Sequence, residues 1–269
     1  RQRQMCIRDS LMMILIAPAK RMRPTIDFMD HKRMPCFLPE SERLVTYLKT
    51  KKQEELKAML NCSDAIAEWT YNSYQHMDVN VSCVPALLSF DGIQYSYMAP
   101  DLFSDEYFVY AERHLRILSG LYGILEPFDG VVPYRLELDS PFRTPFCTSL
   151  YDFWGSKPYQ RLIEEDKQIL DLSSKQYGRL IKRHLDPDVH FVSVYFLEEE
   201  EGRRREKGVY VKMARGEMVR WLAEQNIQQF EDVKRFCRLG YRFDAAVSDD
   251  KQYHFVRKAD WKRSKYKAV

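Results

Sequence analysis

Hydrophobic and polar positions along the chain fall into two kinds of pattern. In some segments apolar residues recur at steps of three and four, which predicts helices with one buried face. In others, short runs rich in β-branched and aromatic residues predict strands. The expected helices are 40–49, 53–60, 65–76, 104–119, 157–166, 175–184 and 214–225. The expected strands are 13–17, 86–90, 131–136, 168–172, 191–196, 209–212, 241–243 and 253–256.

These segments follow one another without strict strand–helix alternation, internal repeats or a long low-complexity linker. The pattern predicts an α+β protein (mixed α and β), with a mixed sheet and surrounding helices in one compact domain, and it does not require a Rossmann domain or a barrel. The charged stretch EEEEGRRREK (198–207) lies between two expected strands. We interpret it as the solvent-exposed tip of a hairpin.

Composition sets limits on partners. The chain has 269 residues, 45% of them hydrophobic and 30% charged, as in an ordinary protein with one large domain or two small ones. Its 42 basic and 39 acidic residues leave a net charge of only +3, so contact with nucleic acid requires a local basic patch. No run approaches the ~20 apolar residues of a membrane span, and we expect no membrane partner.

The cysteines indicate a compartment. They are scattered, without a Cys-x-x-Cys pair or a partnered histidine spacing, so the sequence predicts neither a zinc site nor a disulfide framework. Reduced thiols are typical of the cytosol, and we expect a cytoplasmic protein with no metal and no cofactor. The cysteines are Cys6, Cys36, Cys62, Cys83, Cys147 and Cys237.

The first ten residues, RQRQMCIRDS, carry no periodicity and precede a more natural start at Met12 or Met13. We interpret residues 1–11 as a non-native extension. They are not a signal peptide, because the apolar stretch 11–17 is short and is followed directly by Lys20 and Arg21.

The segment HLRILSGLYG (114–123) is the strongest candidate for phosphate contact. Ser104 can cap a helix with one buried stripe, which Gly120 would end in a left-handed conformation. A Gly-x-x-Gly turn after such a helix can present backbone N–H groups to a phosphate, whereas the alternative is a tight connection packed on the core. The residues assigned to this contact are Arg116, Ser119, Gly120, Tyr122 and Gly123.

Two further cationic groups lie at the ends of expected strands. Lys20 follows the first strand, where side chains reach the rim of a sheet and contact phosphates; the alternative is a surface lysine. Lys212, Arg215 and Gly216 lie where we expect a strand to pass into a helix. Two cations at a helix start oppose the macrodipole unless an anion binds there, or unless one of them pairs with Glu217 or Glu137.

Carboxylates near these cations could add chemistry. Strand alternation places Arg135 and Glu137 on one face and Tyr134 on the other. Arg135 and Glu137 could pair with one another, or Arg135 could take a phosphate while Glu137 orients it. Asp91 precedes Gly92, and a hairpin turn is the leading interpretation. If Asp91 instead faces a cleft beside Glu137, the two carboxylates could bind a metal or transfer protons.

Five motifs resemble the YaaA family of peroxide stress proteins, and they occur in family order over nearly the whole chain. They are IAPAK (16–20), HLRILSGLYGILEPFDGVVPYRLEL (114–138), LYDFWG (150–155), KMARG (212–216) and GYRFD (240–244). The resemblance implies a bacterial cytosolic protein with a YaaA-like domain at 12–259, a basic tail at 260–269, a helix-hairpin-helix element and a basic cleft that binds double-stranded DNA. It also implies a role in limiting oxidative damage connected with iron.

The helix-hairpin-helix element has two candidate positions. The turn at 120–123 frees backbone N–H groups and is preferred, although Pro127 leaves little room for a second helix. The second candidate joins the helix ending near Gln225, through Asn226, to a short helix over 230–236, with phosphate contacts at Lys234, Arg235 and Arg238.

Two hypotheses remain open. A non-enzymatic, monomeric DNA-binding protein would hold duplex phosphates in a broad basic groove without reading bases, and removing the charges of Arg116 and Lys212 would weaken all duplexes alike. An enzyme acting on a nucleotide or nucleobase would use a closed pocket, with phosphate on Lys20, Lys212 and Arg215 and proton transfer by Asp91 or Glu137.

Overall fold

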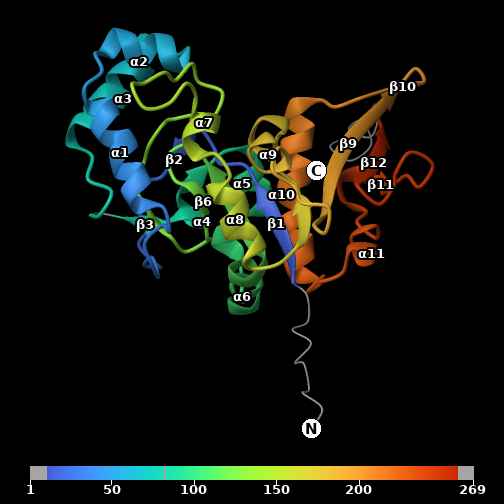
Figure 1. The fold of residues 1–269 in the computed structure, drawn as a ribbon. Helices are drawn as coiled ribbons and strands as arrows, with labels where there is room; N and C mark the ends of the chain where they lie inside the picture. The colour runs from blue at the N-terminus through green and yellow to red at the C-terminus, as the bar shows by residue number, and fades with distance from the viewer. Residues whose placement is uncertain (1–10, 82, 260–269) are drawn as a thin grey trace, which may run out of the picture.

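A computed structural model describes residues 11–81 and 83–259, which form one eight-stranded mixed sheet with helices around it (Figure 1). Its strands are β1 (Met12–Ile16), β5 (Leu115–Ser119), β6 (Gly123–Leu125), β8 (Gln168–Asp171), β9 (His190–Glu200), β10 (Arg203–Arg205), β11 (Arg242–Phe243) and β12 (Gln252–Lys258). Their order is β11-β12-β9-β8-β1-β5-β6, and β10 pairs with β9. The pairs along the middle, from β12 to β5, are parallel, and β6, β10 and β11 are antiparallel to their neighbours. The predicted mixed α and β fold class is confirmed.

Two short sheets and the helices complete the fold. The short strands are β2 (Arg21–Met22) with β4 (Phe90–Asp91), and β3 (Val84–Pro85) with β7 (Gly130–Val131). The helices are α1 (Leu38–Lys49), α2 (Gln53–Leu60), α3 (Asp64–His76), α4 (Ala86–Ser89), α5 (Ile93–Met98), α6 (Asp105–His114), α7 (Leu150–Trp154), α8 (Lys157–Ile163), α9 (Lys175–Lys182), α10 (Gly208–Glu224), α11 (Phe230–Val233) and the 3₁₀ turns η1 (Pro100–Leu102) and η2 (Arg238–Gly240). Figure 1 shows α1, α2 and α3 grouped at one end of the molecule and β9 to β12 at the other, with β1, α9 and α10 between them.

β1 is at the centre of this arrangement. All five of its residues are buried, and it pairs in parallel with β8 on one side and β5 on the other. A continuous apolar run is typical of a parallel strand that is covered on both faces. The carboxyl ends of β1 and β8 therefore meet at the same edge of the sheet, which is where ligands bind in open α/β sheets.

The expected helix 104–119 is half wrong. α6 ends at His114, and Leu115 to Ser119 form β5, in which every residue is buried, including Arg116. A short apolar run in the centre of a sheet lacks the two-residue alternation of an exposed strand, so its pattern is indistinguishable from that of a buried helix. Gly120 thus follows a strand, and the 120–123 turn belongs to the antiparallel β5–β6 hairpin rather than to a helix-hairpin-helix.

Three expected strands are also wrong in whole or in part. Residues 209–212 are the first turn of α10, where packing against α5 overrides the β-branched residues. Residues 86–89 form α4, and the strand expected over 131–136 ends at Val131, two residues before Pro133, which has no N–H to donate to a ladder.

The charged hairpin is confirmed. β9 and β10 pair antiparallel around Glu201 and Gly202, which both have positive φ, and Arg203 to Arg205 lie opposite Glu200 to Glu198. Residues 1–10 of the expected extension (1–11) and the expected basic tail (260–269) lie outside the described residues. Within the described ranges, no helix is both long and apolar enough to cross a membrane.

Candidate functional site

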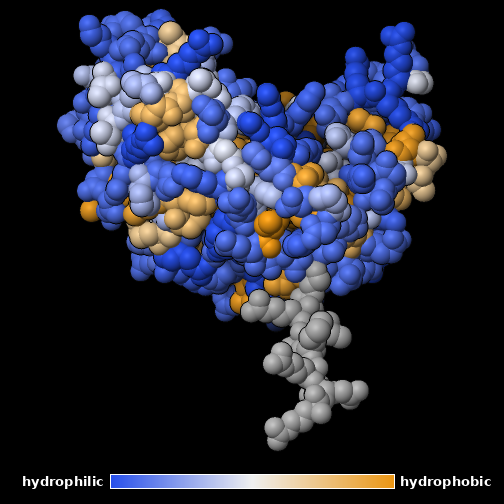
Figure 2. All heavy atoms as spheres, viewed as in Figure 1, coloured by the Kyte–Doolittle hydropathy of each residue, from blue (hydrophilic) through white to orange (hydrophobic). Residues whose placement is uncertain are grey.

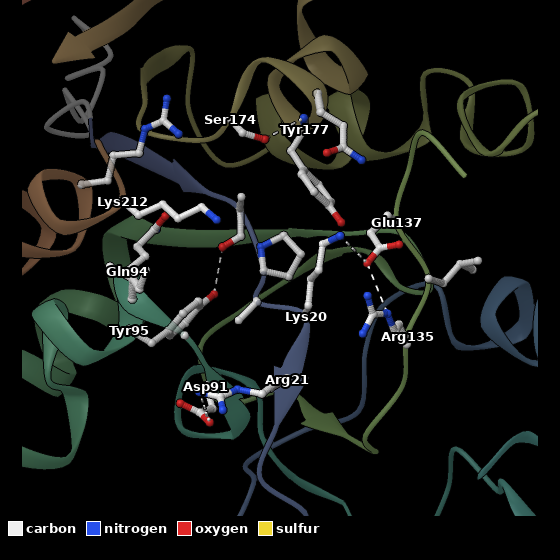
Figure 3. A pocket seen from close by; sticks show the side chains of 18 of the residues that line it. Lys20, Arg21, Asp91, Gln94, Tyr95, Arg135, Glu137, Ser174, Tyr177 and Lys212 are labelled. Carbon is white, nitrogen blue, oxygen red and sulfur yellow. Dashed lines mark hydrogen bonds and ion pairs between the residues drawn. The ribbon is translucent and has the colours of Figure 1, made fainter. Parts of the chain in front are cut away.

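A pocket of about 410 Å³ lies at the carboxyl ends of β1 and β8 (Figure 3). Its lining comes from the segment directly after β1, the start of α9, the helices α5 and α10, and the irregular segment 134–137. The residues that line it are Ala17, Pro18, Ala19, Lys20, Arg21, Asp91, Gly92, Ile93, Gln94, Tyr95, Tyr134, Arg135, Leu136, Glu137, Ser174, Gln176, Tyr177, Lys212 and Arg215. The pocket therefore brings together Lys20, Arg135, Lys212, Arg215, Asp91 and Glu137, all of which were candidates from the sequence.

Lys20, Arg135 and Glu137 form one side of the pocket. Glu137 Oε1 lies 3.2 Å from Lys20 Nζ and 3.5 Å from Arg135 Nε, but neither contact has the geometry of a hydrogen bond. The side chains of Arg135 and Glu137 are each 13% exposed, and that of Lys20 is 65% exposed. The expected pairing of Arg135 with Glu137 is present, and Lys20 adds a second cation.

Lys212 and Arg215 approach from α10. Because α10 begins at Gly208, these cations lie beyond its first turn, so the expected conflict with the macrodipole at a helix start is wrong. Among the described residues, neither cation forms an ion pair: Glu217 binds Arg238 and Glu137 binds Lys20 and Arg135. The alternative in which Glu217 or Glu137 neutralises one of them is therefore wrong.

Arg215 is the most unusual cation of the site. It is 9% exposed, and its Nε has no hydrogen-bond partner in the described part of the chain. Burial lowers the pKa of the guanidinium, and more distant charges such as that of Glu206 only partly oppose this. A buried charge without a carboxylate partner is costly, so this position favours an anion from outside the protein.

Asp91 faces the pocket but is not the corner of a hairpin. It ends β4, which pairs with β2, and the next residue, Gly92, precedes α5. Asp91 Oδ2 forms an ion pair with Arg21 Nη2 at 3.2 Å. Asp91 and Glu137 thus line the same pocket, each beside a cation, and no group of three or more metal-ligating side chains occurs among residues 11–81 and 83–259.

Tyrosines form much of the remaining wall. The hydroxyl of Tyr95 donates to the carbonyl of Ala17 at 3.1 Å. Burial raises the pKa of Tyr95, Tyr134 and Tyr177, so their hydroxyls stay protonated and can donate but do not add negative charge.

The structure places the other candidates outside the pocket lining. Arg116 is 5% exposed and pairs with Glu165, and its Nη1 also donates to the carbonyls of Leu115 and Glu112 at 2.6 and 3.0 Å. The charge of Arg116 is thus neutralised inside the protein. Gly216 is buried where α10 crosses α5, and a Cβ there would lie 2.0 Å from the carbonyl oxygen of Gln94.

The Gly120–Gly123 turn is packed on the core. Ser119 Oγ lies 2.6 Å from the hydroxyl of Tyr134 and accepts the N–H of Tyr122 at 2.9 Å, and Tyr122 is fully buried. A Cβ at Gly120 would lie 2.1 Å from the carbonyl oxygen of Leu136, and Gly123 has φ +72° against Trp154. The alternative interpretation, a tight connection, is the one that the structure shows.

The second helix-hairpin-helix position has a helix–turn–helix outline but a very short second helix. α10 ends at Glu224, Asn226 has φ 48°, and α11 spans four residues. Its three cations are already paired within the protein. Lys234 binds Glu231, Arg235 binds Asp232, and Arg238 binds Glu217 and Glu224.

Several lining residues were not candidates from the sequence. Gln94 and Tyr95 lie on α5, a six-residue helix that was not expected, and they reach the pocket only because α5 packs on α10. Ser174 carried one local signal, since its side chain caps α9 by accepting the N–H of Tyr177 at 3.4 Å.

Comparison with known proteins assigns the family. Residues 12–247 match the family described as peroxide stress protein YaaA. The chain belongs to the YaaA family. The YaaA resemblance drawn from the motifs is therefore confirmed.

Similar proteins cover this YaaA-family chain almost from end to end. A UPF0246 protein of Desulfitobacterium hafniense is 48% identical over 246 residues, which make up 91% of this chain and 98% of that protein. A UPF0246 protein of Agathobacter rectalis is 40% identical over 92% of this chain and 99% of its own length. One of Lachnoclostridium phytofermentans is 41% identical over 91% of this chain and 96% of its own length.

Proposed function

We propose that this YaaA-family protein acts in the bacterial response to peroxide by binding double-stranded DNA, without reading base sequence, and so helps limit iron-dependent damage. The observation that carries the proposal is the convergence on one pocket of Lys20, which follows β1, with Lys212 and Arg215, which lie on α10. Lys20 and Lys212 are exposed enough to reach a phosphate outside it, and Arg215 has no internal ion-pair partner among the described residues.

Local charge supports a phosphate ligand. Five cationic and two acidic side chains line the pocket, a balance of +3, which equals the balance of the entire 269-residue chain. Figure 2 shows a hollow between the α1–α3 end and the β9–β12 end, with mainly hydrophilic residues around its rim, above α9 and α10, two of the helices that line the pocket. Positive charge gathered in a concave surface attracts polyanions more strongly than the same charge spread over a sphere.

The contacts in this proposal are fewer than the sequence suggested. Arg116 and the Gly120–Gly123 turn are buried, so we assign phosphate contact to Lys20, Arg21 and Lys212 at the rim, with Arg215 deeper in the pocket. Protein cations that bind phosphates release the condensed counterions of DNA. If iron ions are among these counterions, their release from the DNA would lower the production of oxidants next to the bases.

A cytoplasmic monomer is part of the same proposal. The five cysteines in the described ranges are free thiols, which fits a reducing compartment. Sedimentation of the purified protein tests the oligomeric state.

Glu137 favours a second candidate, an enzyme acting on a nucleotide or nucleobase. Its carboxylate lies in the wall of the same pocket as Lys20 and Arg215, so a phosphate and a proton acceptor could engage one bound molecule.

A titration of purified protein with unrelated duplexes at 50 and 200 mM salt tests the primary proposal. Neutralisation of about three phosphates gives a slope of roughly −2.7 in log K against log salt, so affinity should fall about 40-fold over this range and equally for each duplex. Absence of binding at 50 mM salt would refute duplex binding, and equal affinity at both salts would refute its electrostatic basis.

A further inference from the structure

The lining of the pocket contains a cluster of buried polar atoms without hydrogen-bond partners. Eight such side-chain atoms occur in the described part of the chain, and four of them belong to residues of this pocket: Gln94 Nε2, Arg135 Nε, Glu137 Oε1 and Arg215 Nε. Gln94 and Arg215 are at least nine-tenths buried. Native proteins satisfy most buried polar groups, so a cluster of exceptions in one cavity indicates a missing ligand.

These atoms define the chemistry of that ligand. Three are N–H donors, which need acceptors, and one is a carboxylate oxygen, which needs a donor. Figure 3 shows Lys212 and Gln94 on one side of the pocket and Arg135 and Glu137 on the opposite side. The ligand must therefore present an anion towards α10, and an N–H or O–H next to an acceptor towards residues 135–137.

The charge of the lining and the volume of the pocket limit the kinds of ligand that fit. A zwitterion such as an amino acid would place its ammonium against Glu137, but Lys20 and Arg135 already neutralise this carboxylate. The lining balance of +3 favours an anion of more than one charge. A volume of about 410 Å³ lies in the range of small-molecule sites, ~300–1,000 Å³, and cannot hold a duplex.

We propose that the pocket binds one nucleotide, with its phosphate on Arg215 and Lys212 and the N–H/C=O edge of a keto base, such as guanine, on Glu137 and Arg135. Guanine presents two N–H groups beside a carbonyl, which complements a carboxylate next to a guanidinium. Three tyrosines also line the pocket, and aromatic side chains are a usual stacking partner for bases. This inference deepens the proposed function, because the nucleotide would come either from DNA, by extrusion of one residue, or from the free pool.

Calorimetric titration with dGMP, dAMP and deoxyguanosine tests the site directly. We expect dGMP to bind at least 10-fold more tightly than either of the others. Arg215→Met should lower the affinity for dGMP to that for deoxyguanosine, and Lys212→Met, at an exposed position, should weaken dGMP at least 5-fold. Glu137→Gln should remove the preference for dGMP over dAMP. The exposed Arg203→Met, with the same charge change on β10, should leave all affinities unchanged.

Each outcome decides the assignment. Absence of dGMP binding, or dAMP binding as tight as dGMP, overturns it, as does an effect of Arg203→Met equal to that of Lys212→Met. A duplex with one bulged guanine distinguishes the sources: binding at least 10-fold tighter than to the paired duplex, lost in Glu137→Gln, assigns the nucleotide to DNA, and dGMP binding without that gain assigns it to the free pool. If dGMP binds and the paired duplex does not, this inference stands and the proposed duplex binding fails.

Discussion

Replacing Arg215 by methionine should stabilise the ligand-free protein. Arg215 is 9% exposed and has no carboxylate partner in the described ranges, so folding removes its charge from water with little compensation. Methionine has a similar length without the charge. Relief of the unsatisfied group should raise the free energy of unfolding by about 1–3 kcal/mol. Each kcal/mol corresponds to roughly 3 °C in Tm for a chain of this size.

Arg116→Met is the matched comparison, because Arg116 is also buried, at 5% exposed, but is paired with Glu165. Its removal leaves the Glu165 carboxylate, which is 17% exposed, with Arg161 at 3.0 Å as its one remaining ion-pair partner among the described residues. Loss of one member of a buried pair costs ~3–5 kcal/mol, and we expect the lower end of this range. The two Arg→Met changes should therefore shift stability in opposite directions.

Urea unfolding in phosphate-free buffer, monitored by circular dichroism, measures the free energy of unfolding of both variants. Thermal unfolding of the same proteins measures their Tm. Phosphate should raise the Tm of the wild type but not that of Arg215→Met, because a ligand stabilises only a state that binds it. Destabilisation of Arg215→Met similar to that of Arg116→Met would refute the reasoning, since it would mean that the guanidinium is satisfied within the protein.

Two further predictions concern the scaffold. Burial, followed by the charge of Glu126, raises the pKa of Asp129 to about 7. The folded state therefore binds one more proton than the unfolded state between about pH 4 and 7. The free energy of unfolding falls as pH rises through this window, by at most about 4 kcal/mol. Asp129→Asn should match the wild type near pH 4 and exceed it at pH 8 in urea unfolding, and a parallel pH profile for the two proteins would contradict this. Gly216→Ala should lower the free energy of unfolding by about 3 kcal/mol, because its Cβ would lie 2.0 Å from the Gln94 carbonyl oxygen. Gly208→Ala on the same helix has open space around it and should stabilise the protein slightly. Equal Tm values for the two variants would show that α10 can shift on α5.

Segments with strong local patterns were predicted well from the sequence. The amphipathic helices α1, α2 and α3 and the apolar strands β1, β8 and β9 agree with expectation to within a few residues. β5 was missed because a strand buried on both faces has no alternation to recognise. The start of α10 was missed because its β-branched residues favour a strand locally, and only packing on α5 makes them helical.

The residues of the site also differ in whether a local sequence pattern predicts their position. The position of Lys20 at the sheet edge was predicted correctly because Lys20 follows a strand whose carboxyl end lies there, and the pocket lies at this edge. Arg116 was misjudged because its neutralising partner, Glu165, is 49 residues away in sequence. Gln94 reaches the pocket only through the contact between α5 and α10, which no local pattern encodes.

The most direct test of phosphate binding at the pocket is the salt dependence of duplex affinity in a Lys20→Met/Lys212→Met double variant. Lys49→Met/Lys258→Met, at two exposed positions outside the pocket lining, is the control with the same charge change. We predict that the slope of log K against log salt decreases in magnitude by about 1.8 in the pocket variant, with affinity at least 10-fold lower for every duplex at 50 mM salt, and that the control stays close to the wild type. An unchanged slope in the pocket variant, or an equal loss in the control, would contradict the account.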